Sequence, residues 1–365
     1  MPGPRFTPLS PGAIRTRQVI SGLVHENLTA RDLLDEVGTR LRRVVPFDSG
    51  SWWTVDSETL LPTELADFTF ADVEREVNED DVNRLIDLDE RRLSSASLAL
   101  ATEGIKNRSA RYVSTHIQAG IGDEMRILAR SGTNTWGAAC LIRGDDMPDF
   151  TAAEVRYAGS IAHDVGLALR GELLRIATTR NSASSGGAGT LILSADDTIE
   201  GFTPEATHWM RRLGIAEGVG QLPTAMRWVS LQARAQERSN GQSVRVRAAR
   251  SRIPLADGDF VVVKAEPLHG SAESKVVMTF EPASRASLLT LLMALHDLTP
   301  REKELAELLV NGWAVPDIAR ELALSPHTVR DHVKAIYTKV GVRSRPELTA
   351  HLGGVTDSYS SQETA

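Results

Sequence analysis

Four closely spaced helix signals between residues 298 and 352 restrict the fold more than any other feature of this chain. The first is Leu298-Thr299-Pro300-Arg301-Glu302, in which the Thr299 hydroxyl can accept from a free first-turn amide and Glu302 can accept from the amide of Thr299. Proline is tolerated in a first helical turn, and Asn311-Gly312 supplies a left-handed stop. These signals predict a helix over about 299–311.

Two further helices follow, with a tight turn between them. Pro316 begins a short second helix, and Ser325-Pro326 caps a third, which ends at Gly341. The third helix has an apolar stripe at helical spacing, formed by Val329, Val333, Ile336, Tyr337 and Val340. Ser344-Arg345-Pro346-Glu347 predicts a capping box and a fourth helix. The order indicates a helix-turn-helix.

The other face of the third helix is polar and carries Arg330, Asp331 and Lys334, with His327 at its start. Such a row can enter the major groove of DNA. The alternative is a solvated helix face, and it is strongest for Asp331, because an acid near phosphates weakens binding unless it reads a base or orients an arginine. His332 borders the apolar stripe, so it is as well placed to pack as to touch DNA.

The motifs Asp317-Ile318-Ala319, Thr328-Val329-Arg330-Asp331-His332 and Lys339-Val340-Gly341-Val342-Arg343-Ser344-Arg345, together with the first helix start, resemble the LuxR-type helix-turn-helix. The resemblance implies that the third helix lies in the major groove and that Arg330, Asp331 and Lys334 read bases. Arg330 and Lys334 would donate to guanine, and Asp331 would accept from cytosine. The residues expected at the DNA backbone are Ser325, His327, Thr328, Lys339, Arg343 and Arg345, for which plain solvation is the alternative.

One position departs from the family pattern. Ala314-Val315-Pro316 stands where the family often has polar residues before the second helix, which puts phosphate contacts from that position in doubt. The fold is not in doubt, because proline is tolerated there.

Charge is distributed unevenly along the 365 residues. The net charge is −7, which argues against indiscriminate binding of nucleic acid. From 325 to 345, however, five basic residues (330, 334, 339, 343 and 345) outnumber one acidic residue (331), a local balance of +4. The expected nucleic-acid footprint is therefore local.

The single cysteine, Cys140, excludes a disulfide within the chain and a cysteine-rich zinc site. It lies in the apolar run Gly137-Ala-Ala-Cys-Leu-Ile142, so we expect a small buried strand residue rather than a reactive thiol. The proline-rich start has no export signal, and the apolar stretch 288–295 is too short to span a bilayer. We expect a cytoplasmic protein with no membrane partner.

Residues 1–17 are expected to be a disordered tail, and residues 18–177 resemble a GAF domain. The order is a helix from Thr29, a strand at Ser51-Trp52-Trp53-Thr54-Val55, a variable middle, a strand at 136–143 and a long helix capped at Thr151-Ala-Ala-Glu154. Trp52 and Trp53 should split between the core and the outer face of the sheet. His116 and His163 have no cluster around them, so we expect surface or core histidines rather than ligands.

The remaining segments complete a multidomain α+β chain. Residues 178–189 predict a flexible linker, since Ser185-Gly-Gly-Ala-Gly189 lacks the Gly-Lys-Ser/Thr of a phosphate loop. Residues 190–283, with strands expected near 191–193, 199–202, 244–247, 260–263 and 276–280, resemble a small PAS domain with an antiparallel sheet. A connecting helix at 284–297 leads to the helix-turn-helix at 298–352, and 353–365 form a second disordered tail.

These features favour a sequence-specific DNA-binding transcription regulator, in which the GAF-like or PAS-like domain senses a signal. One reading helix offers few base contacts, so we expect a homodimer on an inverted repeat, through helix 285–296 or the long GAF-like helix, with RNA polymerase as a further partner. No cofactor, metal site or catalytic residue is identified, and a small-molecule ligand of either upstream domain stays open. The alternatives are a protein-interaction module whose helix-turn-helix does not bind DNA and a GAF-type reductase, which would need several cysteines.

Overall fold

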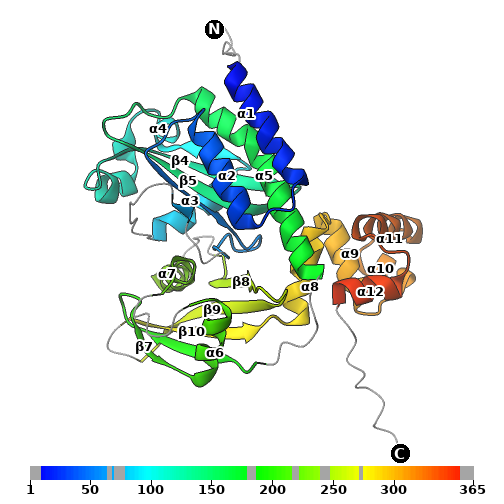
Figure 1. Ribbon diagram of the computed structural model, residues 1–365. Helices are drawn as coiled ribbons and strands as arrows, with labels where there is room; N and C mark the ends of the chain where they lie inside the picture. The colour runs from blue at the N-terminus through cyan, green and yellow to red at the C-terminus, as the bar shows by residue number, and fades with distance from the viewer. Residues whose placement is uncertain are drawn as a thin grey trace, which may run out of the picture.

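The computed structural model describes residues 10–63, 68–69, 79–178, 186–215, 222–238, 247–270 and 274–353. Figure 1 shows an N-terminal region (10–178) with one sheet, a middle region (186–282) with a second sheet, and a C-terminal region (299–353) made of helices. Helix α8 (Arg285–Leu295) connects the last two. The predicted fold class is confirmed: a multidomain α+β chain with a GAF-like sheet-and-helix domain, a small antiparallel sheet domain and an all-α C-terminal part. The sheet of the first domain, for which only an α/β arrangement was predicted, is antiparallel as well.

The N-terminal region is built on a five-stranded antiparallel sheet with the order β2-β1-β5-β4-β3. Its strands are β1 (Ser49–Thr54), β2 (Phe68–Thr69), β3 (Ser95–Ser97), β4 (Ile121–Ser131) and β5 (Asn134–Gly144). Helices α1 (Pro11–Gly22), α2 (Ala30–Arg42) and α5 (Ala152–Thr178) gather on one side of this sheet (Figure 1). The shorter elements are η1 (Leu23–His25), α3 (Glu79–Glu90), α4 (Leu98–Ala101), η2 (Lys106–Arg108) and η3 (Tyr112–His116).

The long helix α5 starts at the capping box predicted from the sequence. The Glu154 amide donates to Thr151 Oγ1 (3.3 Å), and the Thr151 amide donates to Glu154 Oε2 (2.8 Å). Gly166 allows α5 to approach the sheet closely, because a Cβ at this position would lie 2.5 Å from the backbone of Arg130. This contact seats the middle of α5 against β4.

The middle region repeats the same strand order with β7-β6-β10-β9-β8. Its strands are β6 (Gly189–Leu193), β7 (Ile199–Phe202), β8 (Arg250–Pro254), β9 (Phe260–Leu268) and β10 (Lys275–Pro282), with helices α6 (Pro204–Arg212) and α7 (Thr224–Arg238). The predicted small antiparallel sheet is confirmed, whereas the likeness to a PAS domain stays a prediction. The strand expected from Val244 falls largely on residues outside those described, and β8 was not predicted.

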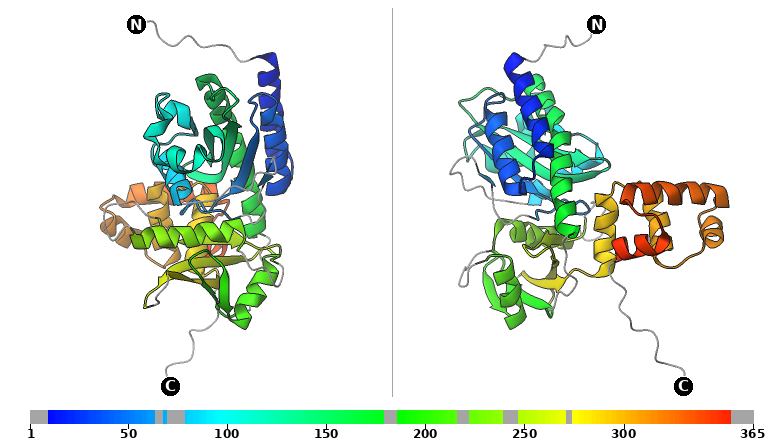
Figure 2. Two further views of the ribbon diagram at one scale, coloured as in Figure 1. Left: turned by 90° about the vertical axis from the view of Figure 1, so that its left-hand side faces the viewer. Right: turned by 45° about the vertical axis from the view of Figure 1, so that its right-hand side comes forward.

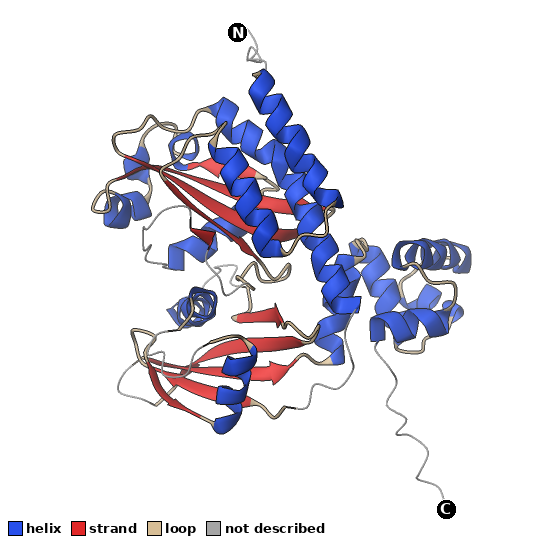
Figure 3. Cartoon of the chain, in the orientation of Figure 1, coloured by secondary structure: helices blue, strands red, loops and turns tan. Residues whose placement is uncertain are grey.

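Helix α7 lies between the two sheets, as Figure 3 shows. Trp52 and Trp53 point to opposite faces of β1, as predicted, but both are buried, at 0% and 8% exposed. Trp53 packs against Trp228 of α7, with ring centroids 5.7 Å apart. The face that we expected to be an outer one is therefore an interface between the regions.

The ends of the chain differ from the expected tails. We predicted disorder over 1–17, but Ser10 caps α1, accepting from the Ala13 amide (3.1 Å), and Pro11 fits the first turn of that helix. Residues 1–9 and 354–365 lie outside the described residues, as do 179–185 of the predicted linker. Its first residue, Thr178, ends α5, and its last, Gly189, begins β6. No helix in the described part combines the length and apolar content needed to cross a membrane.

Candidate nucleic-acid interface

The C-terminal region contains the four expected helices, α9 (Pro300–Val310), α10 (Val315–Glu321), α11 (Pro326–Val340) and α12 (Arg345–Gly353). The first capping box is formed as predicted, because the Glu302 amide donates to Thr299 Oγ1 (3.3 Å) and the Thr299 amide donates to Glu302 Oε2 (2.7 Å). At the start of α12, the Glu347 amide donates to Ser344 Oγ (3.4 Å). Local hydrogen bonds therefore set where these helices begin.

Helix α11 is positioned by its cap, its stop and its apolar stripe. The Thr328 amide donates to Ser325 Oγ (3.0 Å), and Gly341 ends the helix with a φ of 79°. Val329 and Ile336 are fully buried, while Val333 and Tyr337 are half-buried. The turn before α11 holds Ala323 at a φ of 53°, a left-handed conformation that the sequence did not predict.

The three predicted base-reading residues are all exposed on one face of α11. Arg330 Nε donates to the Pro326 carbonyl one turn earlier (3.0 Å). Asp331 Oδ2 lies 3.0 Å from His327 Nδ1, one turn earlier. Within the described part of the chain, Lys334 Nζ has no hydrogen bond or ion pair. Two cations and one partnered carboxylate are thus presented together.

Lys339 and Arg345, predicted to contact the DNA backbone, have partners inside the protein. Lys339 Nζ lies 2.7 Å from Glu302 Oε2 and 3.1 Å from the Asp297 carbonyl. Burial raises the pKa of Glu302, but its bonds to Lys339 and Thr299 outweigh this and lower the pKa overall. Arg345 donates twice to the Leu309 carbonyl, at 3.0 and 2.7 Å. These contacts give both side chains a role in holding the helices together, which residue type alone did not reveal.

The other predicted backbone contacts lie near the start of α11 and after its end. Ser325 Oγ and Thr328 Oγ1 are 2.9 Å apart, and His327 is exposed. Arg343 is exposed, and its amide donates to Glu347 Oε2 (2.8 Å). His332 is half-buried, in keeping with its position beside the stripe. The surface available to phosphates therefore centres on Arg343 and the first turn of α11.

Helix α8 packs the C-terminal region against the rest of the chain, as the right-hand view of Figure 2 shows. Its Leu288, Leu291, Met293 and Leu295 are buried in one apolar cluster with α5, α9 and α12. We expected this apolar helix to be covered by its own domains or by a second chain, and its own chain covers it. Of the two helices proposed for a dimer interface, α5 is the one that keeps a large apolar side chain exposed, Leu167.

Polar side chains at the end of α8 add to its packing against the C-terminal region. His296 Nε2 lies 3.0 Å from His351 Nε2, and His296 Nδ1 lies 3.3 Å from the Lys339 carbonyl. Burial lowers the pKa of His296 to about 4, and the nearby His351 and Arg170 act in the same direction. Contacts of His296 at one end of the α8–α9 connection and of Glu302 at the other therefore hold α11 in its orientation.

The turn between β4 and β5 touches the residue that follows this histidine. Gly132 has a φ of 63°, and a Cβ there would lie 1.8 Å from Asp297 Oδ1. Arg170 Nη1 of α5 donates to Ser131 Oγ (3.1 Å) and lies 3.9 Å from Asp297 Oδ2. The N-terminal region therefore contacts the connection as well as α8.

Residues expected not to be ligands are placed as follows. Cys140 is a buried residue of β5, as predicted. His116 is buried with its Nε2 3.0 Å from Glu124 Oε2, and His163 is exposed on α5. Among the described residues, no three His, Cys, Asp or Glu side chains come together as a metal site.

Comparison with known proteins connects residues 296–352 to one family model, that of bacterial regulatory proteins of the luxR family. The spore germination protein GerE of Bacillus subtilis is 42% identical over 55 residues, which are 15% of this chain and 74% of that protein. The probable transcriptional regulatory protein SgaR of Hyphomicrobium methylovorum is 45% identical over 56 residues, 15% of this chain and 26% of that protein. The chain thus spans about a quarter of the length of SgaR.

Among solved structures, the GAF domain from a phosphoenolpyruvate-protein phosphotransferase of Coxiella burnetii covers 46% of this chain and 98% of its own. Its TM-score is 0.33 and its sequence identity is 15%.

Proposed function

Because the chain belongs, through residues 296–352, to the luxR family of bacterial regulatory proteins, we propose that it is a sequence-specific DNA-binding transcription regulator. The observation that carries the proposal is the exposed face of α11, where Arg330 and Lys334 stand opposite the buried Val329 and Ile336. Arginine and lysine can donate to guanine O6 and N7 in the major groove, and Asp331 can accept from cytosine N4.

The roles of individual residues follow from their exposure. Arg330, Asp331 and Lys334 read bases, while Ser325, His327, Thr328 and Arg343 contact phosphates or lie near them. Lys339 and Arg345 act chiefly by fixing α11 and α12 to α9, since their charged groups already bond Glu302 and the Leu309 carbonyl. A surface of this kind gives affinity that falls with salt and specificity that depends on few side chains.

The test is selection of bound fragments from random DNA with the full chain, followed by binding to matched and mismatched sites at two salt concentrations. Arg330→Ala should lose preference at one base position. Lys264→Ala, which removes a cation from β9 paired with Glu281, is the charge-matched control and should bind like the wild type. Failure of the wild type to retain any fragment at low salt would instead favour a protein-interaction module.

We infer that the N-terminal region, the middle region or both sense a signal and bias the C-terminal region. Their contacts with α8 support this, because a ligand that binds two arrangements unequally shifts the population between them. A thermal-shift screen of the full chain against small molecules tests for a ligand. The reductase alternative is disfavoured by Cys140, which is 1% exposed and the only cysteine of the chain.

We also propose a homodimer on an inverted repeat, with RNA polymerase as a further partner, because one α11 supplies few base contacts. With α8 covered, α5 is the favoured interface, through the exposed stripe that includes His163, Leu167 and Gly171. Sedimentation of the chain with and without a selected fragment tests the stoichiometry. A single chain bound to a non-repeated site would contradict the dimer.

A further inference from the structure

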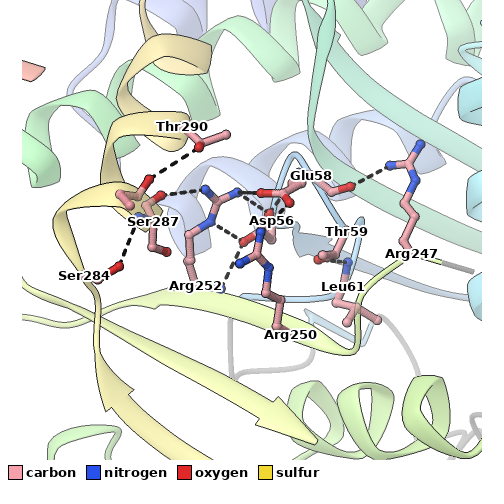
Figure 4. A network of polar contacts seen from close by, with 11 residues as sticks. Asp56, Glu58, Thr59, Leu61, Arg247, Arg250, Arg252, Ser284, Ser287 and Thr290 are labelled. Carbon is pink, nitrogen blue, oxygen red and sulfur yellow. Dashed lines mark hydrogen bonds and ion pairs between the residues drawn. The ribbon is translucent and has the colours of Figure 1, made fainter. Parts of the chain in front are cut away.

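The interface between the N-terminal and middle regions contains a buried ion pair, Asp56 with Arg252, drawn in Figure 4. Arg252 Nε lies 2.7 Å from Asp56 Oδ2, and Arg252 Nη2 lies 2.7 Å from Asp56 Oδ1. The Arg252 amide adds a third bond to Oδ2 (3.0 Å). Both residues are 4% exposed, although they are 196 positions apart in the chain.

The same guanidinium reaches the helix that leads to the C-terminal region. Arg252 Nη1 donates to the Ser287 carbonyl in the first turn of α8 (2.9 Å). Ser284 caps that turn, accepting from the Ser287 amide (3.2 Å). One side chain of β8 therefore holds the loop after β1 and the start of α8 together, as Figure 4 shows.

Exposed and half-buried contacts surround this pair. The Glu58 carboxylate pairs with Arg250 and also lies 3.3 Å from Arg252 Nη2, and the Glu58 carbonyl accepts from Arg247 Nη1 (3.1 Å). Arg247 Nη2 lies 2.7 Å from Asp89 Oδ2 at the end of α3. These contacts keep the two regions together at the rim, whereas Asp56 and Arg252 lie inside the interface.

A buried ion pair of this geometry selects an arrangement more than it adds stability. Removing two charges from water is costly, and the loss is offset only when the geometry of the pair is good. Arginine meets the requirement because its planar fork bonds a carboxylate with two parallel donors. Its remaining nitrogen can then be satisfied by a further acceptor, which here is the Ser287 carbonyl.

We propose that Arg252 is a positioning residue that couples the relative placement of the N-terminal and middle regions to the orientation of the C-terminal helices through α8. Any change that moves Asp56 away from β8 alters the anchor of Ser287. Since α8 packs on α5, α9 and α12, its movement changes where α11 is presented. The effect on DNA rests on the proposed function, but the coupling itself is a property of the fold.

The first experiment is hydrogen exchange of the full chain by mass spectrometry, with Arg252→Lys as the variant. Lysine keeps a positive charge opposite Asp56, but one nitrogen cannot replace a fork that bonds a carboxylate and a carbonyl together. We expect about tenfold faster exchange in α8, with unchanged protection in β4–β5 and β9–β10. Arg250→Gln, which removes the half-exposed partner of Glu58, is the matched control and should exchange like the wild type.

A second readout measures orientation directly. Spin labels at exposed positions, Asp35→Cys on α2 and Glu304→Cys on α9, report the distance between the N-terminal and C-terminal regions, while Cys140 stays buried. The wild-type background should give one narrow distribution, and Arg252→Lys should add a second population. Unchanged exchange in α8 with an unchanged distance distribution would overturn the proposal.

Two further outcomes are decisive. Equal loss of protection in α8 and in both sheets would make Arg252 a general structural residue and also overturn the coupling.

If the wild type binds a selected DNA fragment, Arg252→Lys should change the half-saturation concentration by at least about threefold, while Arg250→Gln stays within about twofold. If the wild type binds no DNA, the proposed function fails, and the exchange and distance measurements still decide the coupling.

Discussion

Charged side chains are exposed on α11 but buried at the interface between the N-terminal and middle regions. On α11, Arg330, Asp331 and Lys334 are exposed, and the polar contacts of Arg330 and Asp331 are with residues of the same helix. At the interface between the two sheets, Arg252 and Asp56 are buried and far apart in sequence. Exposed charge is available to an external partner, whereas buried charge specifies how the chain's own parts fit together. Helix α8 lies between the two sets and joins them.

The largest expected effect comes from breaking the buried pair. Asp56→Ala leaves the buried Arg252 guanidinium with only the half-exposed Glu58 carboxylate, 3.3 Å from its Nη2, and we expect a loss of about 3 kcal/mol in the free energy of unfolding, measured with urea. Burial raises the pKa of Asp56, but the bonds to Arg252 outweigh it and lower the pKa overall. The contribution is therefore present above the unfolded value and is lost as pH falls through the lower folded value.

A double variant sharpens this prediction. Asp56→Leu with Arg252→Met replaces both charges by apolar groups, and most of the stability lost in Asp56→Ala should return. A loss below about 1 kcal/mol for Asp56→Ala would mean that water screens the pair as it screens a surface one.

On the exposed side of the comparison, Arg330→Ala should weaken binding to a matched DNA site by about 1–3 kcal/mol and relax one base position. Arg343→Ala should weaken all sites alike and reduce the salt slope by about one. Titrations on matched and mismatched fragments at two salt concentrations separate the two behaviours. Equal loss on every site for Arg330→Ala would refute its role as a base reader.

Lowering the pH should have a smaller effect, on the packing of the C-terminal region. Burial lowers the pKa of His296 to about 4 when the C-terminal region is packed against α8, which we call the docked form. In an undocked form, the exposed histidine would titrate near ~6.5. The undocked form therefore binds more protons between these values, so docking is favoured above about pH 6.5 and weakens as pH falls toward 4. Between pH 7 and 5 the cost should be about 1–2 kcal/mol.

The spin-label pair on α2 and α9 measures this undocking. Acidification should increase the undocked population in the wild type. His296→Gln should reduce the pH dependence, and the remainder should come from His351, whose pKa burial also lowers. A population that does not change with pH would show that His296 binds protons equally in both forms.

The smallest effect is expected at the rim of the interface. Arg250→Gln removes a half-exposed ion pair with Glu58, and the free energy of unfolding should fall by less than about 1 kcal/mol. Urea unfolding beside Asp56→Ala gives the contrast directly. A loss as large as that of Asp56→Ala would mean that the exposed ion pair stabilises the fold as much as the buried one.

Structural features that depend on residues close together in the chain were predicted correctly from the sequence. Thr299, Ser325 and Gly341 mark helix ends through contacts within a few positions, so the four C-terminal helices were foreseen. The pairing of Lys339 with Glu302 was not foreseen, because the two residues meet only after α9 and α11 have packed. The same reason explains the covered face of Trp53, where a helix from another region supplies the partner.

The contact between Gly132 and Asp297 has a consequence for how such a protein could change over generations. Any side chain at Gly132 would adopt a strained φ of 63° and would displace the Asp297 carboxylate beside the connection to α9. A single inherited substitution at this turn would thus act on the junction between the regions while leaving every side chain of α11 as it is.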